Sequence, residues 1–132
     1  MVGTIRVLCV DDNTDLAEVV CAAIGAEPDM ESVGTLHSAN DLRREVESRQ
    51  PDVVLIDLTM PGENPLAAIA DAARHCPKTR AIVMSGHDDP ATIDAATDSG
   101  AWGFVSKNGD MERIFHAIRA VARGETAFGR QP

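Results

Sequence analysis

The segment Val53–Leu58 reads V-V-L-I-D-L and decides the fold class, because it is apolar on both faces of the strand that it predicts. Strands of this kind are typical of a parallel sheet that is covered by helices on each side. The exception in the segment is Asp57. A carboxylate at the end of a buried strand costs on the order of several kcal/mol unless it is paired or bound to a cation. Asp57 is therefore the first candidate functional residue.

Outward from this segment, strands and helices alternate along the chain. Four further apolar runs predict strands: Ile5–Val10, Met30–Leu36, Arg80–Met84 and Trp102–Val105. Apolar residues at helical spacing follow each strand. The expected helices are Asn13–Ala26 capped by Asn13, a helix capped by Ser38 and ended by Pro51, one from Leu66 ended by Pro77, one opened by Asp88 or Asp89 and ended by Gly100, and one opened by Asp110 and ended by Gly124. Five strand–helix units predict an α/β fold with one parallel sheet.

Length and composition limit the function classes. The chain has 132 residues, of which 44% are hydrophobic, and this suits one globular domain. It contains no apolar run of membrane-spanning length, so we expect a cytoplasmic protein with no membrane partner. The net charge of −9 would repel a phosphate backbone, so we expect no direct nucleic acid binding by this segment. The acidity could equally serve solubility alone.

Polar residues follow most of the predicted strands. They are Asp11 and Asp12 after the first strand, Asp57 on the third, Ser85 after the fourth, and Ser106 and Lys107 after the fifth. Ligands of an open parallel sheet bind beyond the carboxyl ends of its strands, so these side chains are expected to form one site. The second strand supplies Thr35 and His37, which we expect to matter less because that strand would lie at a sheet edge.

Each of these residues also has a structural interpretation. Asp11 or Asp12 could cap the following helix, although two adjacent acids exceed that need. A serine before Gly86 is common in turns, and a lysine after a strand is usually solvated. Asp57 is the hardest to explain structurally.

Taken together, the residues suit phosphoryl transfer. Three carboxylates at one edge would repel one another without a cation, and an all-oxygen set favours Mg²⁺. Lys107 offers a point charge for a phosphoryl oxygen, and Ser85 offers a hydroxyl donor. A carboxylate can itself act as a nucleophile and form an aspartyl phosphate. We therefore expect metal-assisted phosphoryl transfer onto Asp57.

Four motifs together resemble the receiver domains of two-component response regulators. They are V-D-D at Val10–Asp12, L-I-D-L-T-M-P-G at Leu55–Gly62, M-S-G-H-D-D at Met84–Asp89 and G-A-W-G-F-V-S-K at Gly100–Lys107. The resemblance implies a flavodoxin-like fold of five βα units, with strand order 2-1-3-4-5 and helices on both faces. It places the receiver domain at residues 1–124 and leaves residues 125–132 as a tail or as the start of a linker to an output domain.

The resemblance also implies a role for each matched residue. Asp57 would be the phosphoacceptor, assisted by Ser85 and Lys107. The implied Mg²⁺ ligands are Asp11, Asp12, Asp57 and the backbone carbonyl of Thr59. Ser85 and Phe104 would be the switch residues, and Thr59 and His87 are expected to tune dephosphorylation. The implied phosphoryl donor is a sensor histidine kinase or a phosphotransfer protein.

The segment S-G-H-D-D and the ending A-I-R-A-V-A-R-G-E are similar to receivers of the NarL type, which usually precede a DNA-binding domain of the LuxR kind. That subfamily implies transcription regulation and allows homodimerisation on activation. One departure is Asn108 after Lys107, where many receivers have proline. We also expect Trp102 to lie near the site.

Two other functions remain open from the residues. A receiver-like scaffold or protein-binding module that is never phosphorylated would keep the fold but would not need the complete set of site residues. A flavodoxin-like phosphohydrolase would carry its nucleophile after the first strand instead of the third. Nucleotide binding is excluded because no glycine-rich phosphate-binding motif is present. We expect a switch that phosphorylates and dephosphorylates itself, not a turnover enzyme.

Overall fold

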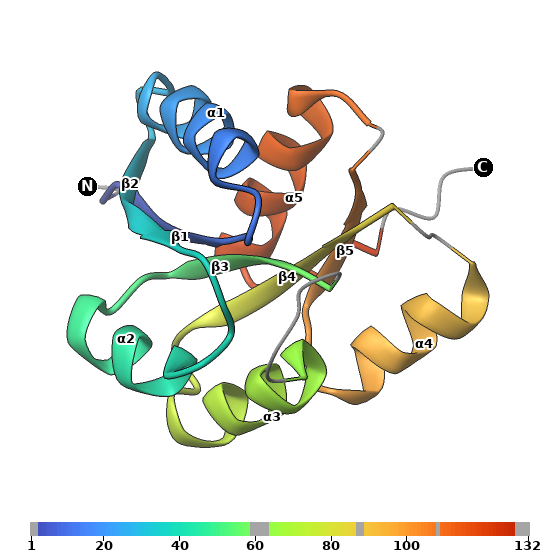
Figure 1. Cartoon of the computed structure of the whole chain (residues 1–132). Helices are drawn as coiled ribbons and strands as arrows, with labels where there is room; N and C mark the ends of the chain where they lie inside the picture. Colours follow the sequence, from blue (N-terminus) through green and yellow to red (C-terminus); the bar gives the residue numbers. More distant parts are fainter. Residues whose placement is uncertain (1–2, 59–63, 87–88, 108, 129–132) are drawn as a thin grey trace.

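A computed structural model of the chain describes residues 3–58, 64–86, 89–107 and 109–128. Its five strands form one parallel sheet with the order β2-β1-β3-β4-β5. The strands are β1 (Ile5–Val10), β2 (Met30–Leu36), β3 (Val53–Asp57), β4 (Arg80–Ser85) and β5 (Gly103–Ser106). The helices are α1 (Thr14–Gly25), α2 (Leu42–Arg49), α3 (Pro65–His75), α4 (Pro90–Asp98) and α5 (Met111–Ala122). The predicted fold and strand order are confirmed (Figure 1).

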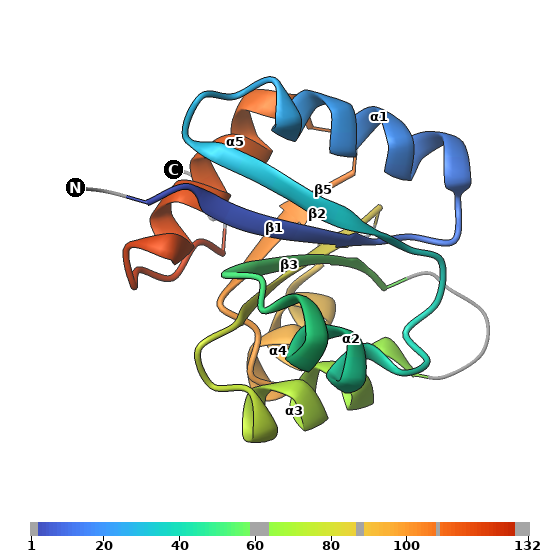
Figure 2. The ribbon, with the colours of Figure 1, turned by 90° about the vertical axis from the view of Figure 1, so that its left-hand side faces the viewer.

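The sheet separates two layers of helices. Helices α1 and α5 cover one face, and α2, α3 and α4 cover the other (Figure 2). Successive residues of β3 alternate between the two faces: Val53 and Leu55 join the apolar cluster under α1 and α5, while Val54 and Ile56 join the cluster under the other three helices. This alternation explains why β3 is apolar throughout, as the sequence predicts for a strand buried on both faces.

Several predicted helix ends are confirmed by their hydrogen bonds. The Leu16 N–H donates to Asn13 Oδ1 over 3.0 Å at the start of α1. The Arg113 N–H donates to Asp110 Oδ1 over 3.2 Å at the start of α5. Gly100 and Gly124 follow α4 and α5 with φ of 102° and 90°, in the left-handed region that glycine adopts without strain. Strand bounds differ from the prediction by one residue at β3, β4 and β5.

The predicted cap of α2 is wrong. Helix α2 begins at Leu42, and its cap residue is Asp41, which has a left-handed φ of 63°. Ser38 instead accepts a hydrogen bond from the Asn40 N–H inside the preceding turn, over 3.2 Å. The turn is held by Ala39, which is 1% exposed and packs in the core. Burial of Ala39 therefore delays the helix start, while Leu42 and Val46 still face the core as predicted.

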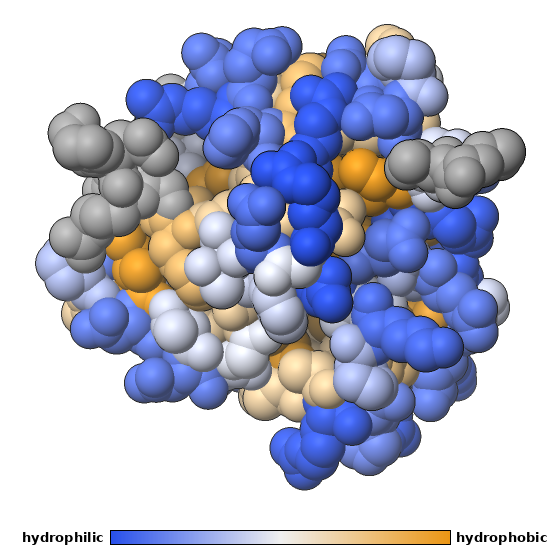
Figure 3. All heavy atoms as spheres, turned by 180° about the vertical axis from the view of Figure 1, so that it is seen from behind, coloured by the Kyte–Doolittle hydropathy of each residue, from blue (hydrophilic) through white to orange (hydrophobic). Residues whose placement is uncertain are grey.

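The described surface is largely polar. Val19 is the exposed large hydrophobic residue of the described chain, at 62% exposure. From behind the molecule, hydrophilic side chains dominate, with smaller apolar patches between them (Figure 3). None of the described helices combines the length and the apolar composition that crossing a bilayer requires.

Arg119 joins two distant parts of the fold. Its guanidinium donates to both carboxylate oxygens of Asp29 over 2.8 and 2.9 Å, and to Glu27 Oε1 over 2.8 Å. These bonds tie α5 to the loop between α1 and β2. The same hydrogen bonds from Arg119 lower the pKa of Asp29 below its ordinary value. Bidentate pairs of this kind are stronger than single surface ion pairs.

Arg119→Lys is expected to lower the free energy of unfolding by about 1 kcal/mol, because an ammonium cannot reproduce the bidentate geometry. Urea denaturation at neutral pH measures the change. Arg123→Lys is the matched control, since Arg123 pairs with Glu125 where both side chains are more than half exposed. Equal stability of the two variants would contradict a stabilising role for the Arg119 network.

Candidate functional site

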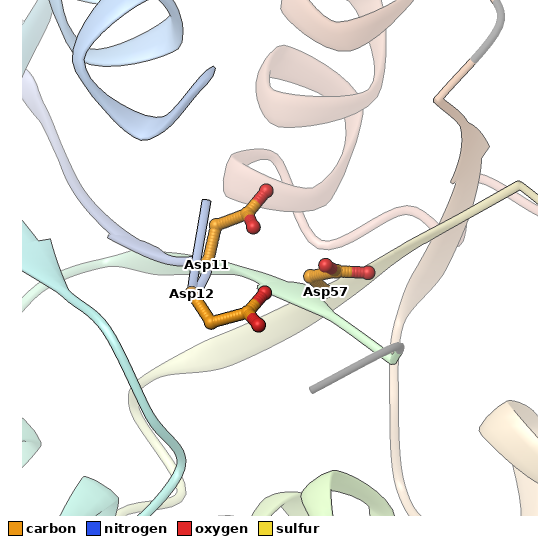
Figure 4. A group of neighbouring side chains, drawn as sticks. All are labelled: Asp11, Asp12 and Asp57. Atoms are coloured by element: carbon orange, nitrogen blue, oxygen red, sulfur yellow. The ribbon is translucent and has the colours of Figure 1, made fainter. Parts of the chain in front are cut away.

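The carboxylates predicted to form a site meet at the carboxyl ends of β1 and β3. Asp57 ends β3 and is 1% exposed, and Asp11, directly after β1, is equally buried. Asp12 follows and is exposed. Each of the three offers an oxygen, and these oxygens lie within 4.8 Å of one another (Figure 4). The sheet topology brings them together because β1 and β3 are neighbours in parallel register.

Asp11 is held so that its two oxygens differ. The Asn13 N–H donates to Asp11 Oδ1 over 2.9 Å. The second oxygen, Oδ2, is buried and has no hydrogen-bond partner within the described residues. Burial raises the pKa of Asp11 above its ordinary value, the hydrogen bond from Asn13 opposes this, and the nearby charge of Asp57 adds to the increase. The ionised form of Asp11 is therefore unfavourable without a positive partner.

Lys107 supplies positive charge to the same site. Its Nζ donates to Asp57 Oδ2 over 2.8 Å and lies 3.5 Å from Asp11 Oδ2. Burial lowers the pKa of Lys107, but the hydrogen bond and charge of Asp57, with the charge of Asp11, outweigh burial and raise it. The lysine is therefore an ammonium at neutral pH. Its backbone is fixed by the bond from its N–H to the Ser85 carbonyl, over 2.9 Å.

The other predicted site residues fall in three groups. Ser85 is 1% exposed and ends β4, one residue beyond Met84, which is paired with Asp57. Phe104 lies on β5, is 3% exposed and packs in the core under α2, α3 and α4. Thr59 and His87 lie outside the described residues, as does Asn108, so their expected roles stay predictions.

The expectation that Trp102 lies near the site is wrong. Trp102 directly precedes β5, whereas Lys107 directly follows it, so the two residues stand at opposite ends of the strand. The Trp102 ring instead lies against the guanidinium of Arg80, the first residue of β4, whose Cζ is 4.5 Å from the ring centroid. Its fluorescence would report on the amino-terminal edge of the sheet.

His37 has a part in the site that its sequence position did not indicate. The end of β2 holds the backbone of Asp11 on both sides. The Asp11 N–H donates to the Leu36 carbonyl over 2.9 Å, and His37 Nδ1 lies 3.2 Å from the Asp11 carbonyl. A carbonyl oxygen can only accept, so the contact requires the tautomer with a proton on Nδ1. Pairing between β1 and β2 makes the contact, and no local motif indicates it.

The donor set fits Mg²⁺. The three clustered ligand groups are all carboxylates, which suit a hard cation. The buried, unpartnered Oδ2 of Asp11 is the observation that tests the fit, because a buried carboxylate oxygen without a partner is costly and a cation would remove that cost. Asp12 is exposed, so the site is open to solvent on one side.

Comparison with known proteins gives concordant matches. A family model described as response regulator receiver domain matches residues 7–119. The transcriptional regulatory protein DegU of Brevibacillus brevis is 30% identical over 120 residues, which cover 91% of this chain and 51% of DegU. The oxygen regulatory protein NreC of Staphylococcus carnosus is 30% identical over 122 residues, covering 92% and 56%. The chain thus spans about half the length of these curated relatives.

Solved structures agree with the sequence matches. The signal receiver domain of the putative response regulator NarL from Mycobacterium tuberculosis superposes with a TM-score of 0.85 and 30% identity, covering 93% of this chain and 99% of that one. A LuxR-family two-component response regulator from Aurantimonas sp. SI85-9A1 gives a TM-score of 0.89 and 28% identity, covering 96% and 90%.

Proposed function

Because this chain belongs to the response regulator receiver domain family, with relatives of the NarL type, we propose that it is a switch activated by phosphorylation of Asp57. The observation that carries the proposal is a buried Asp57 carboxylate with the Lys107 ammonium 2.8 Å away and two further carboxylates beside it. A buried acid with an adjacent cation is the arrangement that a phosphoryl acceptor needs.

The reaction that we propose moves one phosphoryl group. A carboxylate oxygen of Asp57 attacks the phosphorus of a phosphohistidine on a sensor kinase or phosphotransfer protein. The phosphorus–nitrogen bond breaks, an acyl phosphate forms on Asp57, and the imidazole leaves and takes up a proton from solvent. Lys107 stays within reach of Asp57 and can pair with the oxygens of the transferred group. Ser85, buried at the end of β4, is suited to donate its hydroxyl to the same group.

Mg²⁺ would be held by Asp11, Asp12 and Asp57, with the Thr59 carbonyl as the further ligand that the family resemblance implies. When bound, the ion would neutralise the charge that gathers on the phosphoryl oxygens. Asp11 Oδ2 is the atom best placed to gain from it, because it is buried without a hydrogen-bond partner in the described chain.

The output of the switch follows from the relatives only as a proposal. DegU is named a transcriptional regulator, and this chain covers about half of it. We propose that phosphorylation changes a surface of the receiver that a partner, or a DNA-binding output domain, reads. The chain would then act as a signalling protein and not as an enzyme that turns over substrate.

Covalent labelling tests the proposal directly. The protein is incubated with acetyl phosphate and Mg²⁺, and its intact mass is measured. The expected result is a gain of one phosphoryl group that is lost on treatment with hydroxylamine, which cleaves acyl phosphates, and that is absent in EDTA. No mass gain with acetyl phosphate or with a phosphorylated kinase would support the rival function, a scaffold that is never phosphorylated.

His37→Ala is expected to weaken Mg²⁺ binding about 10-fold, because residues that orient a metal ligand typically contribute that much. His37→Asn should restore most of the affinity, since its amide N–H can take the place of Nδ1–H. Isothermal titration with Mg²⁺ measures both. His75→Ala is the matched control: His75 Nδ1 also contacts a backbone carbonyl, that of Asp71, on a helix away from the site. Unchanged affinity in His37→Ala would exclude this positioning role.

A further inference from the structure

The outer edge of β5 is covered by the end of the described chain. Strand β5 is last in the sheet order, so one row of its backbone groups faces outward. The Ala127 N–H donates to the Trp102 carbonyl over 2.8 Å, and the Phe104 N–H donates to the Ala127 carbonyl over 2.9 Å. Ala127 and Gly103 form a parallel bridge, and the red end of the ribbon lies beside β5 in Figure 1. These bonds follow the pattern of a parallel strand pair.

The turn after α5 returns the chain to β5. Gly124 has a φ of 90°, and the Glu125 N–H donates to the Ala120 carbonyl over 2.9 Å. A left-handed residue at this position reverses the chain direction at a helix end. The segment Glu125–Phe128 therefore runs back along the outer edge of β5.

Gly103 is explained by this segment. A Cβ at residue 103 would lie 2.8 Å from the Ala127 carbonyl oxygen, closer than real Cβ contacts. The φ of Gly103 is outside the left-handed region, so its own backbone does not require glycine. Glycine inside a strand often marks the close approach of another backbone, and here the approaching backbone is residue 127.

The side chains of the segment follow the two faces of the sheet. Ala127 packs against the apolar cluster under α1 and α5. The next residue, Phe128, packs against the cluster on the opposite face, which contains Phe104. Successive residues on opposite faces are the mark of a strand. Residues 127 and 128 thus extend both cores, contrary to the behaviour of a loose tail.

We propose that the outer edge of β5 is a docking surface for the chain's own segment Glu125–Phe128, and that docking is coupled to the state of Asp57. The coupling rests on the proposed function. Strand β5 joins the two: its outer edge bonds to the segment, and Lys107 at its end bonds to Asp57. Phe104 lies between them. The docked segment holds the Phe104 backbone in the position that buries its ring, so it stabilises the Phe104-buried form of the switch.

Hydrogen exchange tests the docking. Ala127→Pro removes the donor to the Trp102 carbonyl and changes nothing in the sheet. The expected result is at least a 10-fold loss of exchange protection at the Phe104 N–H, measured by NMR. The Trp102 N–H, which bonds to Ala81 on the inner edge of β5, should keep its protection and serves as the internal control. Thr126→Ala, at an exposed side chain, should behave as the wild type.

Equal Phe104 protection in Ala127→Pro and Thr126→Ala would overturn the docking. Protection of Phe104 that falls when the wild-type protein is diluted would also overturn it, because the segment would then come from a second copy of the chain.

Binding of a phosphoryl mimic tests the coupling. The affinity for beryllofluoride with Mg²⁺ is expected to fall about five-fold or more in Ala127→Pro, relative to Thr126→Ala. By reciprocity, beryllofluoride should raise Phe104 protection in the wild type by the same factor. Equal affinities, with Phe104 protection lost, would refute the coupling. Absence of beryllofluoride binding by the wild type would contradict the proposed function, and the exchange measurement would still decide whether the segment docks.

Discussion

Asp57→Asn is expected to abolish covalent phosphorylation, lowering its rate by about a thousand-fold or more. An amide is not a nucleophile toward phosphorus, so the variant lacks the attacking atom. It keeps the size of the side chain and an oxygen that can accept the hydrogen bond from Lys107, which spans 2.8 Å in the wild type. Intact mass after incubation with acetyl phosphate and Mg²⁺ measures the effect, and thermal denaturation shows whether the fold survives.

Asp98→Asn is the control for this loss, because Asp98 is an exposed residue at the end of α4. It should label as fast as the wild type. Labelling of Asp57→Asn at the wild-type rate would place the phosphoryl group on a different residue. That result would require a new interpretation of the buried Asp57–Lys107 pair.

Asp11→Asn is expected to make the metal-free protein more stable, by about 1 kcal/mol at neutral pH in EDTA. Burial is the main cause of the raised Asp11 pKa, and the charge of Asp57 adds to it. The folded state therefore binds more protons than the unfolded state at pH values just above the ordinary Asp pKa of 3.8. Stability of the wild type then falls as the pH rises through that interval. The advantage of the variant should vanish at lower pH.

Mg²⁺ is expected to reverse the order of stability. Binding to the folded wild type stabilises it in proportion to the logarithm of the Mg²⁺ concentration, and Asp11→Asn loses most of this gain with its ligand. Urea denaturation in EDTA and in Mg²⁺ measures both effects. Asp15→Asn, an exposed acid in the first turn of α1, should respond to Mg²⁺ as the wild type does. A less stable Asp11→Asn in EDTA would contradict the role assigned to burial.

The buried strand and its carboxylate were predictable because both signals are local. An apolar run in β3 has only one way to bury both faces, and Asp57 is conspicuous inside it. The caps at Asn13 and Asp110 were predictable for the same reason, since a cap bonds to an N–H three residues away. The metal-binding trio was predictable because parallel strands present their carboxyl ends at one edge.

The start of α2 was not predictable from its cap signal. Ser38 is a good cap residue in isolation, but Ala39 beside it is drawn into the core. Burial of that side chain outweighs the local hydrogen bond, and the helix begins at Leu42 instead. Packing of this kind depends on the whole α2 and α3 layer.

By itself, the sequence determined the α/β class, the parallel sheet and the set of residues at its carboxyl edge. Periodicity and burial act within a few neighbouring residues, so they can be recognised without coordinates. Only the tertiary structure decided that His37 holds the backbone of Asp11, and that Ala127 pairs with β5 beside Gly103. Both contacts end on backbone groups of another strand. Strand register determines such contacts, and register arises only when the whole sheet is assembled.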